Sequence, residues 1–195
     1  VVGTLTTTDV DVGDTHTYTL SGTDADSFEV VNGQLKLKDS VSADYENKNS
    51  YSVIVTATDS SISGSTISKS FTIGVTDINE APTAIALSAT AIDENAAGAV
   101  VGTLTTTDVD AGDSHTYTLS GTDADSFEVV DGQLKLKDSV TADYETQTSY
   151  SVTVTATDSG SLTATQDFTV SVNNLNDNDP VISSDSSLSM AENSN

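Results

Sequence analysis

Aspartate and glutamate, the side chains with the clearest chemical capability in this sequence, occur in short motifs that recur 99 residues apart. The motifs are Asp-x-Asp, Ala-Asp-Tyr-Glu and Ala-Thr-Asp, and their acidic members are Asp9, Asp11, Asp44, Glu46 and Asp59 in the first copy and Asp108, Asp110, Asp143, Glu145 and Asp158 in the second. In an extended segment, side chains two positions apart point to the same side, so Asp-x-Asp presents two carboxylates together. Calcium takes about six to eight oxygen ligands of this kind. The motifs therefore indicate binding of a hard cation.

Two further kinds of segment offer oxygen ligands between the copies. The Asn/Asp-containing linkers before the two prolines contain Asp77, Asn79 and Glu80 in the first case and Asn176, Asp177 and Asn178 in the second. A Glu-Asn pair occurs at Glu94 and again at Glu192. These acids are grouped where one copy would meet the next, and such clustering favours cation binding.

The elements that must position these acids are strands. Val1–Asp59 and Val100–Asp158 align without a gap, and only eight of their 59 positions differ, which indicates tandem modules. Apolar residues alternate with small polar ones in each copy, as at Tyr51, Val53 and Val55, apart from Ile54, where the second copy has Thr153. Short strands with regular turn signals, and no convincing helix, predict an all-β fold with one antiparallel β-sandwich per copy.

The proline-containing linkers set the predicted domain bounds. Residues 1–80 form a repeat that lacks its first strand, 81–178 a complete repeat, and 179–195 the first strand of a third. Within the complete repeat, Ala84–Gly98 is expected to be a first strand followed by a turn, and Val181–Asn193 is a related stretch.

Composition excludes several classes of function. The formal net charge is −24, from 30 acidic residues against six basic ones, so nucleic acid is not expected as a partner. No apolar run approaches the ~18 residues of a membrane span, so no direct membrane insertion is expected. The absence of cysteine excludes a disulfide framework. An alternative explanation of the charge is the solvated acidic surface of a halophilic protein. The acids of such a surface would be scattered, whereas these acids are clustered.

The order and spacing of five motifs resemble the cadherin repeat. These motifs are Asp-Glu-Asn, Asp-x-Asp, Asp-Tyr-Glu, Ala-Thr-Asp and Asn-Asp-Asn-x-Pro. The Thr/Asp-rich style is similar to the cadherin-like repeats of large bacterial surface adhesins, and the resemblance covers essentially the whole chain. It implies tandem Greek-key, immunoglobulin-like β-sandwiches of cadherin type joined end to end, with Ca²⁺ bound where they meet. It also implies neighbouring repeats as partners and an extracellular or cell-surface location.

Carried onto this chain, the resemblance implies three sets of metal ligands. The internal junction would use Asp44, Glu46, Asp77, Asn79, Glu80, Asp108, Asp110 and Asp158. A second, half-built junction would use Glu94, Asp143, Glu145, Asn176, Asp177 and Asn178. A third would use Asp9, Asp11 and Asp59, with Glu192 supplied by another molecule. Because the first linker reads Asn-Glu-Ala instead of Asn-Asp-Asn, we expect weak binding, roughly 10⁻⁴–10⁻³ M.

The remaining acids and the histidines are expected to be structural. Asp24 and Asp123 are expected to cap a turn, and Asp14 and Asp113 to form Asx turns. The two histidines occupy equivalent positions in a strand and have no matching nucleophile, so no enzyme is expected. An EF-hand starting at Asp9 is excluded because its twelfth residue is leucine.

The sequence thus predicts a calcium-rigidified stalk or extender segment of a secreted or cell-surface adhesin that supports cell adhesion. The alternative is a homophilic or carbohydrate-binding recognition module, which an exposed aromatic cluster confined to one copy would indicate. A further hypothesis is head-to-tail strand exchange, in which Ser187–Glu192 of one molecule completes the first repeat of the next. A frayed first repeat and a disordered tail are the alternative to that exchange.

Overall fold

The computed structural model describes residues 1–11 and 13–183, and the chain divides by its contacts into two compact units. The first unit comprises Val1–Glu80 and Val109–Gly112, and the second comprises Ala81–Asp108 and the chain from Asp113 onward. The expected strand donor Ser187–Glu192 lies outside the described residues. No helix in the described ranges is long and apolar enough to cross a membrane.

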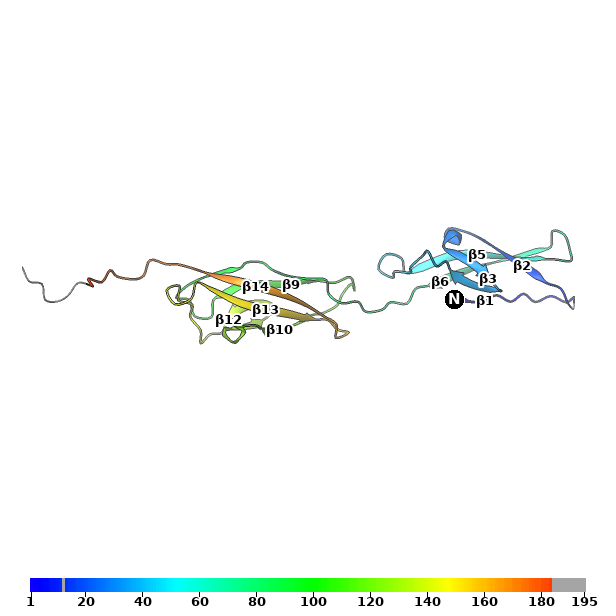
Figure 1. The fold of residues 1–195 in the computed structure, drawn as a ribbon. Coiled ribbons are helices and arrows are strands. Elements are labelled where there is room, and N and C mark those ends of the chain that lie inside the picture. Colours follow the sequence, from blue (N-terminus) through cyan, green and yellow to red (C-terminus); the bar gives the residue numbers. More distant parts are fainter. Residues whose placement is uncertain (12, 184–195) are drawn as a thin grey trace, which may run out of the picture. The chain divides into compact units, whose positions relative to one another are not determined.

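The first unit is a β-sandwich of two three-stranded sheets, with strand orders β1-β4-β3 and β2-β5-β6 (Figure 1). Every strand pair in it is antiparallel. Its elements are β1 (Gly3–Thr4), β2 (His16–Ser21), the short 3₁₀ helix η1 (Ala25–Ser27), β3 (Phe28–Val31), β4 (Gln34–Leu37), β5 (Ser50–Asp59) and β6 (Thr66–Gly74).

The period-two pattern of the sequence decides which face of each strand is buried. Along β5, Tyr51, Val53 and Val55 are buried, whereas Ser52 and Ile54 between them are more exposed. The ring of Tyr51 meets that of Phe28 edge-on at a centroid distance of 5.4 Å, which joins the two sheets across the core. The turn between β3 and β4 places Asn32 at φ 51° and Gly33 at φ 73°, the left-handed pair that a tight hairpin requires.

The second unit is a sandwich of two four-stranded sheets, with strand orders β11-β12-β9-β7 and β10-β13-β14-β8. Among the described strands of this unit, only the β8–β14 pair is parallel. The elements are β7 (Ala84–Leu87), β8 (Ala91–Asp93), β9 (Val100–Thr107), β10 (Thr116–Ser120), η2 (Ala124–Ser126), β11 (Phe127–Val130), β12 (Gln133–Leu136), β13 (Ser149–Thr157) and β14 (Thr163–Asn173). The predicted all-β, immunoglobulin-like architecture is confirmed.

The segment expected to form one first strand forms two strands instead. β7 pairs with β9 of one sheet, and β8 pairs with β14 of the other, so the chain crosses from sheet to sheet between Leu87 and Ala91. Ile85 and Ile92, one from each strand, are both buried in the core. This crossing closes the open side of the second sandwich.

Candidate metal centres

Four groups of carboxylates in the described part of the chain have acidic oxygen atoms within 4.8 Å of one another. Group 1 is Asp9, Asp14 and Asp59; group 2 is Glu46, Asp77, Glu80 and Asp110; group 3 is Asp108, Asp113 and Asp158; group 4 is Glu94, Glu145 and Asp177. Groups 1 and 3 occupy the same positions in the two sequence copies, 99 residues apart.

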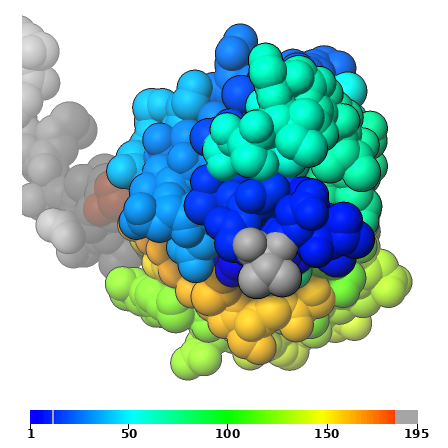
Figure 2. Space-filling model, turned by 90° about the vertical axis from the view of Figure 1, so that its right-hand side faces the viewer, coloured from blue at the N-terminus to red at the C-terminus, as the bar shows by residue number. Residues whose placement is uncertain are grey.

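Group 1 lies where β5 ends and turns toward β6. Figure 2 looks onto this end of the first unit, where the dark-blue N-terminal segment lies beside the turquoise β5–β6 hairpin. The Asp59 carboxylate accepts hydrogen bonds from the backbone N–H of Ser61 at 2.7 Å and from its hydroxyl at 2.8 Å. These bonds, the backbone one first, lower the pKa of Asp59. The carboxylate is therefore held ionised and oriented.

Group 3 repeats this construction in the second unit. Asp158 is buried and accepts a hydrogen bond from the backbone N–H of Leu162 at 2.7 Å. Asp113 accepts one from the hydroxyl of Ser159 at 2.9 Å through Oδ1, whereas its buried Oδ2 has no hydrogen-bond partner among the described residues. A buried carboxylate oxygen without a donor is costly, and a coordinated cation would remove that cost.

Group 2 combines the linker that follows β6 with a loop contributed by later sequence. All four members belong to the first unit, because Val109–Gly112 is grouped with it by contacts. The backbone N–H of Glu80 donates to Asp110 Oδ2 at 2.8 Å. Partial desolvation, and then the negative charges of Glu46, Asp110 and Asp77, raise the pKa of Glu80. The group therefore carries more negative charge than its protein surroundings offset.

Group 4 is built around Glu94, whose side chain is only 2% exposed. Its carboxylate accepts the backbone N–H groups of Tyr144 at 2.8 Å and Leu175 at 2.6 Å. Asp177 accepts a hydrogen bond from the side-chain amide of Asn95 at 2.6 Å. These bonds fix two carboxylates at the place where the chain leaves β14.

The structure places most of the predicted ligands in these groups, but it divides the acids of the predicted internal junction, because Asp108 and Asp158 lie in group 3 and the other grouped acids of that junction lie in group 2. Those found in the four groups are Asp9, Glu46, Asp59, Asp77, Glu80, Glu94, Asp108, Asp110, Glu145, Asp158 and Asp177. Two predicted amides lie beside them: Asn79 donates to the carbonyl of Glu80 at 3.1 Å, and Asn178 donates to Asp177 at 2.9 Å.

Other predicted ligands lie outside these groups. Asp44 and Asp143 accept hydrogen bonds from backbone N–H groups three residues later, at 2.9 and 3.1 Å, and so close a turn. Asp11 and Asn176 are exposed, and Glu192 lies outside the described residues. A carboxylate that already stabilises its own turn is less available to a group formed from distant loops.

Asp14 and Asp113 belong to the acidic groups, although neither was predicted as a ligand from the sequence. Both were expected to form Asx turns, but each accepts a hydrogen bond from a serine hydroxyl in the loop after β5 or β13. Their equivalent positions, five residues after the first Asp of Asp-x-Asp, were the available signal.

The role expected for Asp24, capping its own turn, is wrong in detail. Asp24 precedes η1 but makes no capping hydrogen bond to it. Its carboxylate accepts the N–H of Ser52 at 2.7 Å and contacts Lys48. The hydrogen bond from Lys48, followed by that from Ser52, lowers the pKa of Asp24. Asp24 therefore ties η1 to β5.

The donor set fits a hard divalent cation. Each group offers carboxylate oxygens, and no cysteine exists in the chain to favour a softer metal. The buried Oδ2 of Asp113 and the raised pKa of Glu80 are the local signs of negative charge that a cation would offset.

These groups lie on immunoglobulin-like β-sandwiches, and comparison with known proteins shows that the chain is similar to cadherins. Residues 88–173 match the family model of the Cadherin domain. Cadherin-related family member 2 of Homo sapiens is 32% identical over 204 residues, covering 92% of this chain and 15% of that protein. Protocadherin Fat 1 of Homo sapiens is 28% identical, covering 95% of this chain and 4% of that protein.

Solved structures of the same class share the fold. The protocadherin GammaB4 extracellular domain matches with a TM-score of 0.69 and 25% identity, over 87% of this chain and 28% of that chain. Mouse cadherin-23 EC22-24 matches with a TM-score of 0.66 and 20% identity, over 83% of this chain and 55% of that chain. The chain thus spans a small part of the curated relatives that it matches.

Proposed function

We propose that this chain is a calcium-binding segment of an extracellular adhesion protein, in which cations stiffen the connection between successive β-sandwiches. The observation that carries the proposal is the recurrence of one carboxylate group in both units, as groups 1 and 3. A net charge of −24 opposes close approach of these loops, and divalent cations would offset it where the charges converge.

The linker is the part of the chain on which a cation would act most directly. Group 2 contains Asp77 and Glu80 from the linker and Asp110 from the loop after β9. A cation held by these carboxylates would tie the linker to that loop and so restrict its motion. Without it, mutual repulsion among the carboxylates favours a looser linker.

The finer predictions stay proposals. These are a stalk or extender role, membership of a large bacterial adhesin, head-to-tail strand exchange, and repeat bounds at 1–80 and 81–178. No catalytic role is proposed, because the carboxylate groups recur in both units and the relatives are cadherins and protocadherins.

Calcium titration by calorimetry tests the proposal. Asp113→Asn and Glu46→Gln each remove one ligand charge while keeping side-chain size, and each is expected to weaken calcium binding at its group at least tenfold. Asp39→Asn is the matched control, because that side chain is 95% exposed and belongs to none of the groups. Absence of binding at millimolar calcium, or equal losses in all three variants, would contradict the proposal.

Small-angle scattering tests the mechanical consequence. The maximum dimension of the chain should be better defined in millimolar calcium than in chelator, because the linker then samples fewer conformations. Asp77→Asn and Glu80→Gln together should reduce the difference between the two conditions. Identical scattering curves with calcium and with chelator would refute the stiffening role while leaving calcium binding to the calorimetric test.

A further inference from the structure

The turn between β3 and β4 contains the single Asn-Gly pair of the sequence, Asn32-Gly33. When glycine follows asparagine, the backbone nitrogen of the glycine attacks the asparagine side-chain amide readily, because glycine places no side chain beside that nitrogen. The five-membered succinimide that forms is then opened by water. The pair is therefore a candidate site for spontaneous conversion of asparagine to aspartate.

The surroundings of the pair leave both reacting groups accessible. Asn32 is exposed. Within the described residues, neither its side-chain amide nor the backbone N–H of Gly33 is engaged in a hydrogen bond. A Cβ placed on Gly33 would meet nothing within 4 Å, so the space beside this part of the backbone is open.

The second unit carries the product of this reaction at the equivalent turn. Asp131 and Gly132 lie 99 positions after Asn32 and Gly33, and their φ angles of 50° and 74° match the 51° and 73° of the first turn. The flanking strands pair in the same register in both units. Asparagine and aspartate are both enriched in this left-handed region. An aspartate at this position therefore leaves the turn unchanged.

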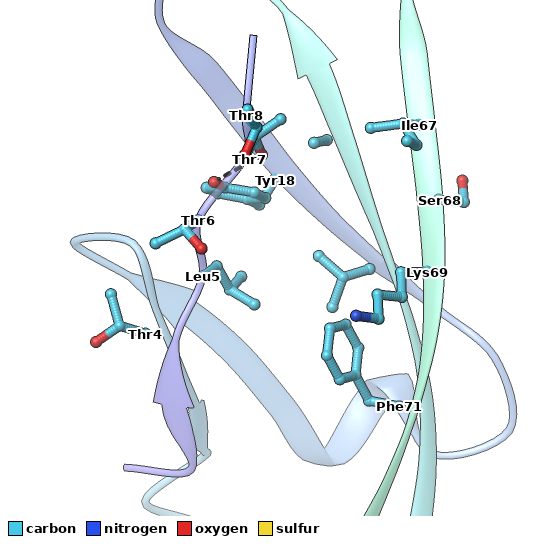
Figure 3. Close-up of a pocket in the computed structure, with 12 residues that line it drawn as sticks. Thr4, Leu5, Thr6, Thr7, Thr8, Tyr18, Ile67, Ser68, Lys69 and Phe71 are labelled. Carbon is cyan, nitrogen blue, oxygen red and sulfur yellow. Dashed lines mark hydrogen bonds between the residues drawn. The ribbon is translucent and has the colours of Figure 1, made fainter.

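A backbone hydrogen bond ties the turn to the N-terminal segment. The carbonyl of Gly33 accepts the N–H of Leu5 at 2.8 Å, and the carbonyl of Gly132 accepts that of Leu104 at the same distance. Leu5 packs against the core of the first unit, and Figure 3 shows its side chain pointing toward Phe71. The turn is thus held both by this bond and by the pairing of β3 with β4.

Water can open the succinimide in two ways, and the fold distinguishes the products. Cleavage between the Gly33 nitrogen and Asn32 Cγ restores the ordinary backbone with an aspartate side chain. Cleavage between that nitrogen and the main-chain carbonyl carbon of Asn32 leaves a backbone that runs through Cβ and Cγ, which is isoaspartate. This longer path adds a methylene to a two-residue turn, so it cannot keep both the strand register and the Leu5 bond.

We propose that Asn32-Gly33 is a self-modification site at which the folded hairpin converts Asn32 to aspartate. The Gly33 nitrogen bonds to Asn32 Cγ, the Cγ–Nδ2 bond breaks, and the Gly33 amide proton leaves on the ammonia that is released. Water then gives its hydroxyl to Cγ and a proton to the Gly33 nitrogen. The product adds one negative charge and gives the first unit the turn residue that the second unit already has.

Incubation of the full chain in H₂¹⁸O at mildly alkaline pH tests the proposal. Peptide mass spectrometry should show exchange of the Asn32 amide for one ¹⁸O-labelled carboxylate at a rate at least tenfold above that at Asn95. Asn95 is the internal control, because it is also left-handed, at φ 66°, but precedes alanine and donates its amide to Asp177 at 2.6 Å. The rate at Asn32 should rise with pH, because the attacking nitrogen must lose its proton.

An endoprotease that cleaves before aspartate but not before isoaspartate identifies the product. The folded chain should yield mainly aspartate at position 32. The same chain in urea, where the strands are unpaired, should yield mainly isoaspartate. Asn32→Asp, which supplies the proposed product directly, should have the melting temperature of the unsubstituted chain.

Two further variants separate the reaction from the stability of the turn. Asp131→Asn transfers the reactive pair to the second unit and should create a second site of similar rate, because the two turns share their φ angles. Asn32→Gln keeps an amide at the turn but would need a six-membered ring, so it should abolish the reaction in the first unit.

Three results would overturn the proposal. One is an equal rate at Asn32 and Asn95. Another is isoaspartate as the main product of the folded chain. The third is reaction at Asn32 with none at the substituted position of Asp131→Asn, which would show that the shared turn does not govern the chemistry.

Discussion

Replacing Glu94 should destabilise the second unit even when no cation is present. The side chain is 2% exposed, and its two carboxylate oxygens accept the backbone N–H groups of Tyr144 and Leu175 at 2.8 and 2.6 Å. These bonds join the segment after β8 to the loop before β13 and to the chain that leaves β14. Glu94→Ala removes both acceptors at once.

The expected loss of stability follows from the two backbone N–H donors that would lose their acceptor. Both bonds are part-buried, so each N–H left without an acceptor costs an amount at the lower end of about 1–3 kcal/mol, and loss of the carboxylate recovers part of its own desolvation cost. We therefore expect Glu94→Ala to lower the free energy of unfolding of the second unit by about 2 kcal/mol. At roughly 4–8 °C per kcal/mol for a domain of this size, the melting temperature should fall by more than about 8 °C. Glu94→Gln, which keeps one acceptor oxygen, should lose less.

The assay is calorimetric unfolding in chelator, combined with hydrogen exchange at the amides of Tyr144 and Leu175. Glu145→Gln is the matched control, because Glu145 belongs to the same acidic group but is exposed. That variant should weaken calcium binding and leave the calcium-free unfolding temperature unchanged. A loss below about 1 kcal/mol for Glu94→Ala, with both amides still protected, would refute the reasoning that this carboxylate is a structural acceptor.

Two other predictions concern equivalent glycines and acid stability. Gly102→Ala should destabilise the second unit by about 1–3 kcal/mol, because the new Cβ would lie 2.7 Å from Ser88 Oγ, whereas Gly3→Ala should be nearly neutral. Urea unfolding of both variants measures the contrast, and equal losses would contradict it. Because donors from Ser61 lower the pKa of Asp59, its contribution is present above the unfolded pKa of about 3.9 and is lost as pH falls through the folded pKa. Acid unfolding in chelator should therefore be less steep for Asp59→Asn; an unchanged transition would count against this contribution.

The fold was predictable because burial on a sandwich strand repeats every two residues. The spacing of Tyr51, Val53 and Val55 at every second position is local information, and it assigns the inward face before any partner strand is known. The division of Ala84–Gly98 into β7 and β8 was not predictable in the same way. Its crossing between the sheets depends on contact with Gly102, which is distant in the sequence.

Which acids form the acidic groups was also only partly predictable from the sequence. The motifs identified Asp9, Asp59, Asp108 and Asp158, because each lies at a recognisable strand end. Whether an acid joins a group depends on which loops meet after folding. Asp44 and Asp143 are recognisable as motif members, yet both bond to their own turns.

By itself, the sequence determined the all-β class, the duplication and the types of ligand available, because each of these depends on residue type and local spacing. Only the tertiary structure decided which carboxylates converge and which distant residues share a core. Ile85 and Ile92 both enter the core of the second unit because the chain crosses from one sheet to the other between β7 and β8. Burial is a property of what packs against a residue, and local spacing does not fix neighbours that are distant in the sequence.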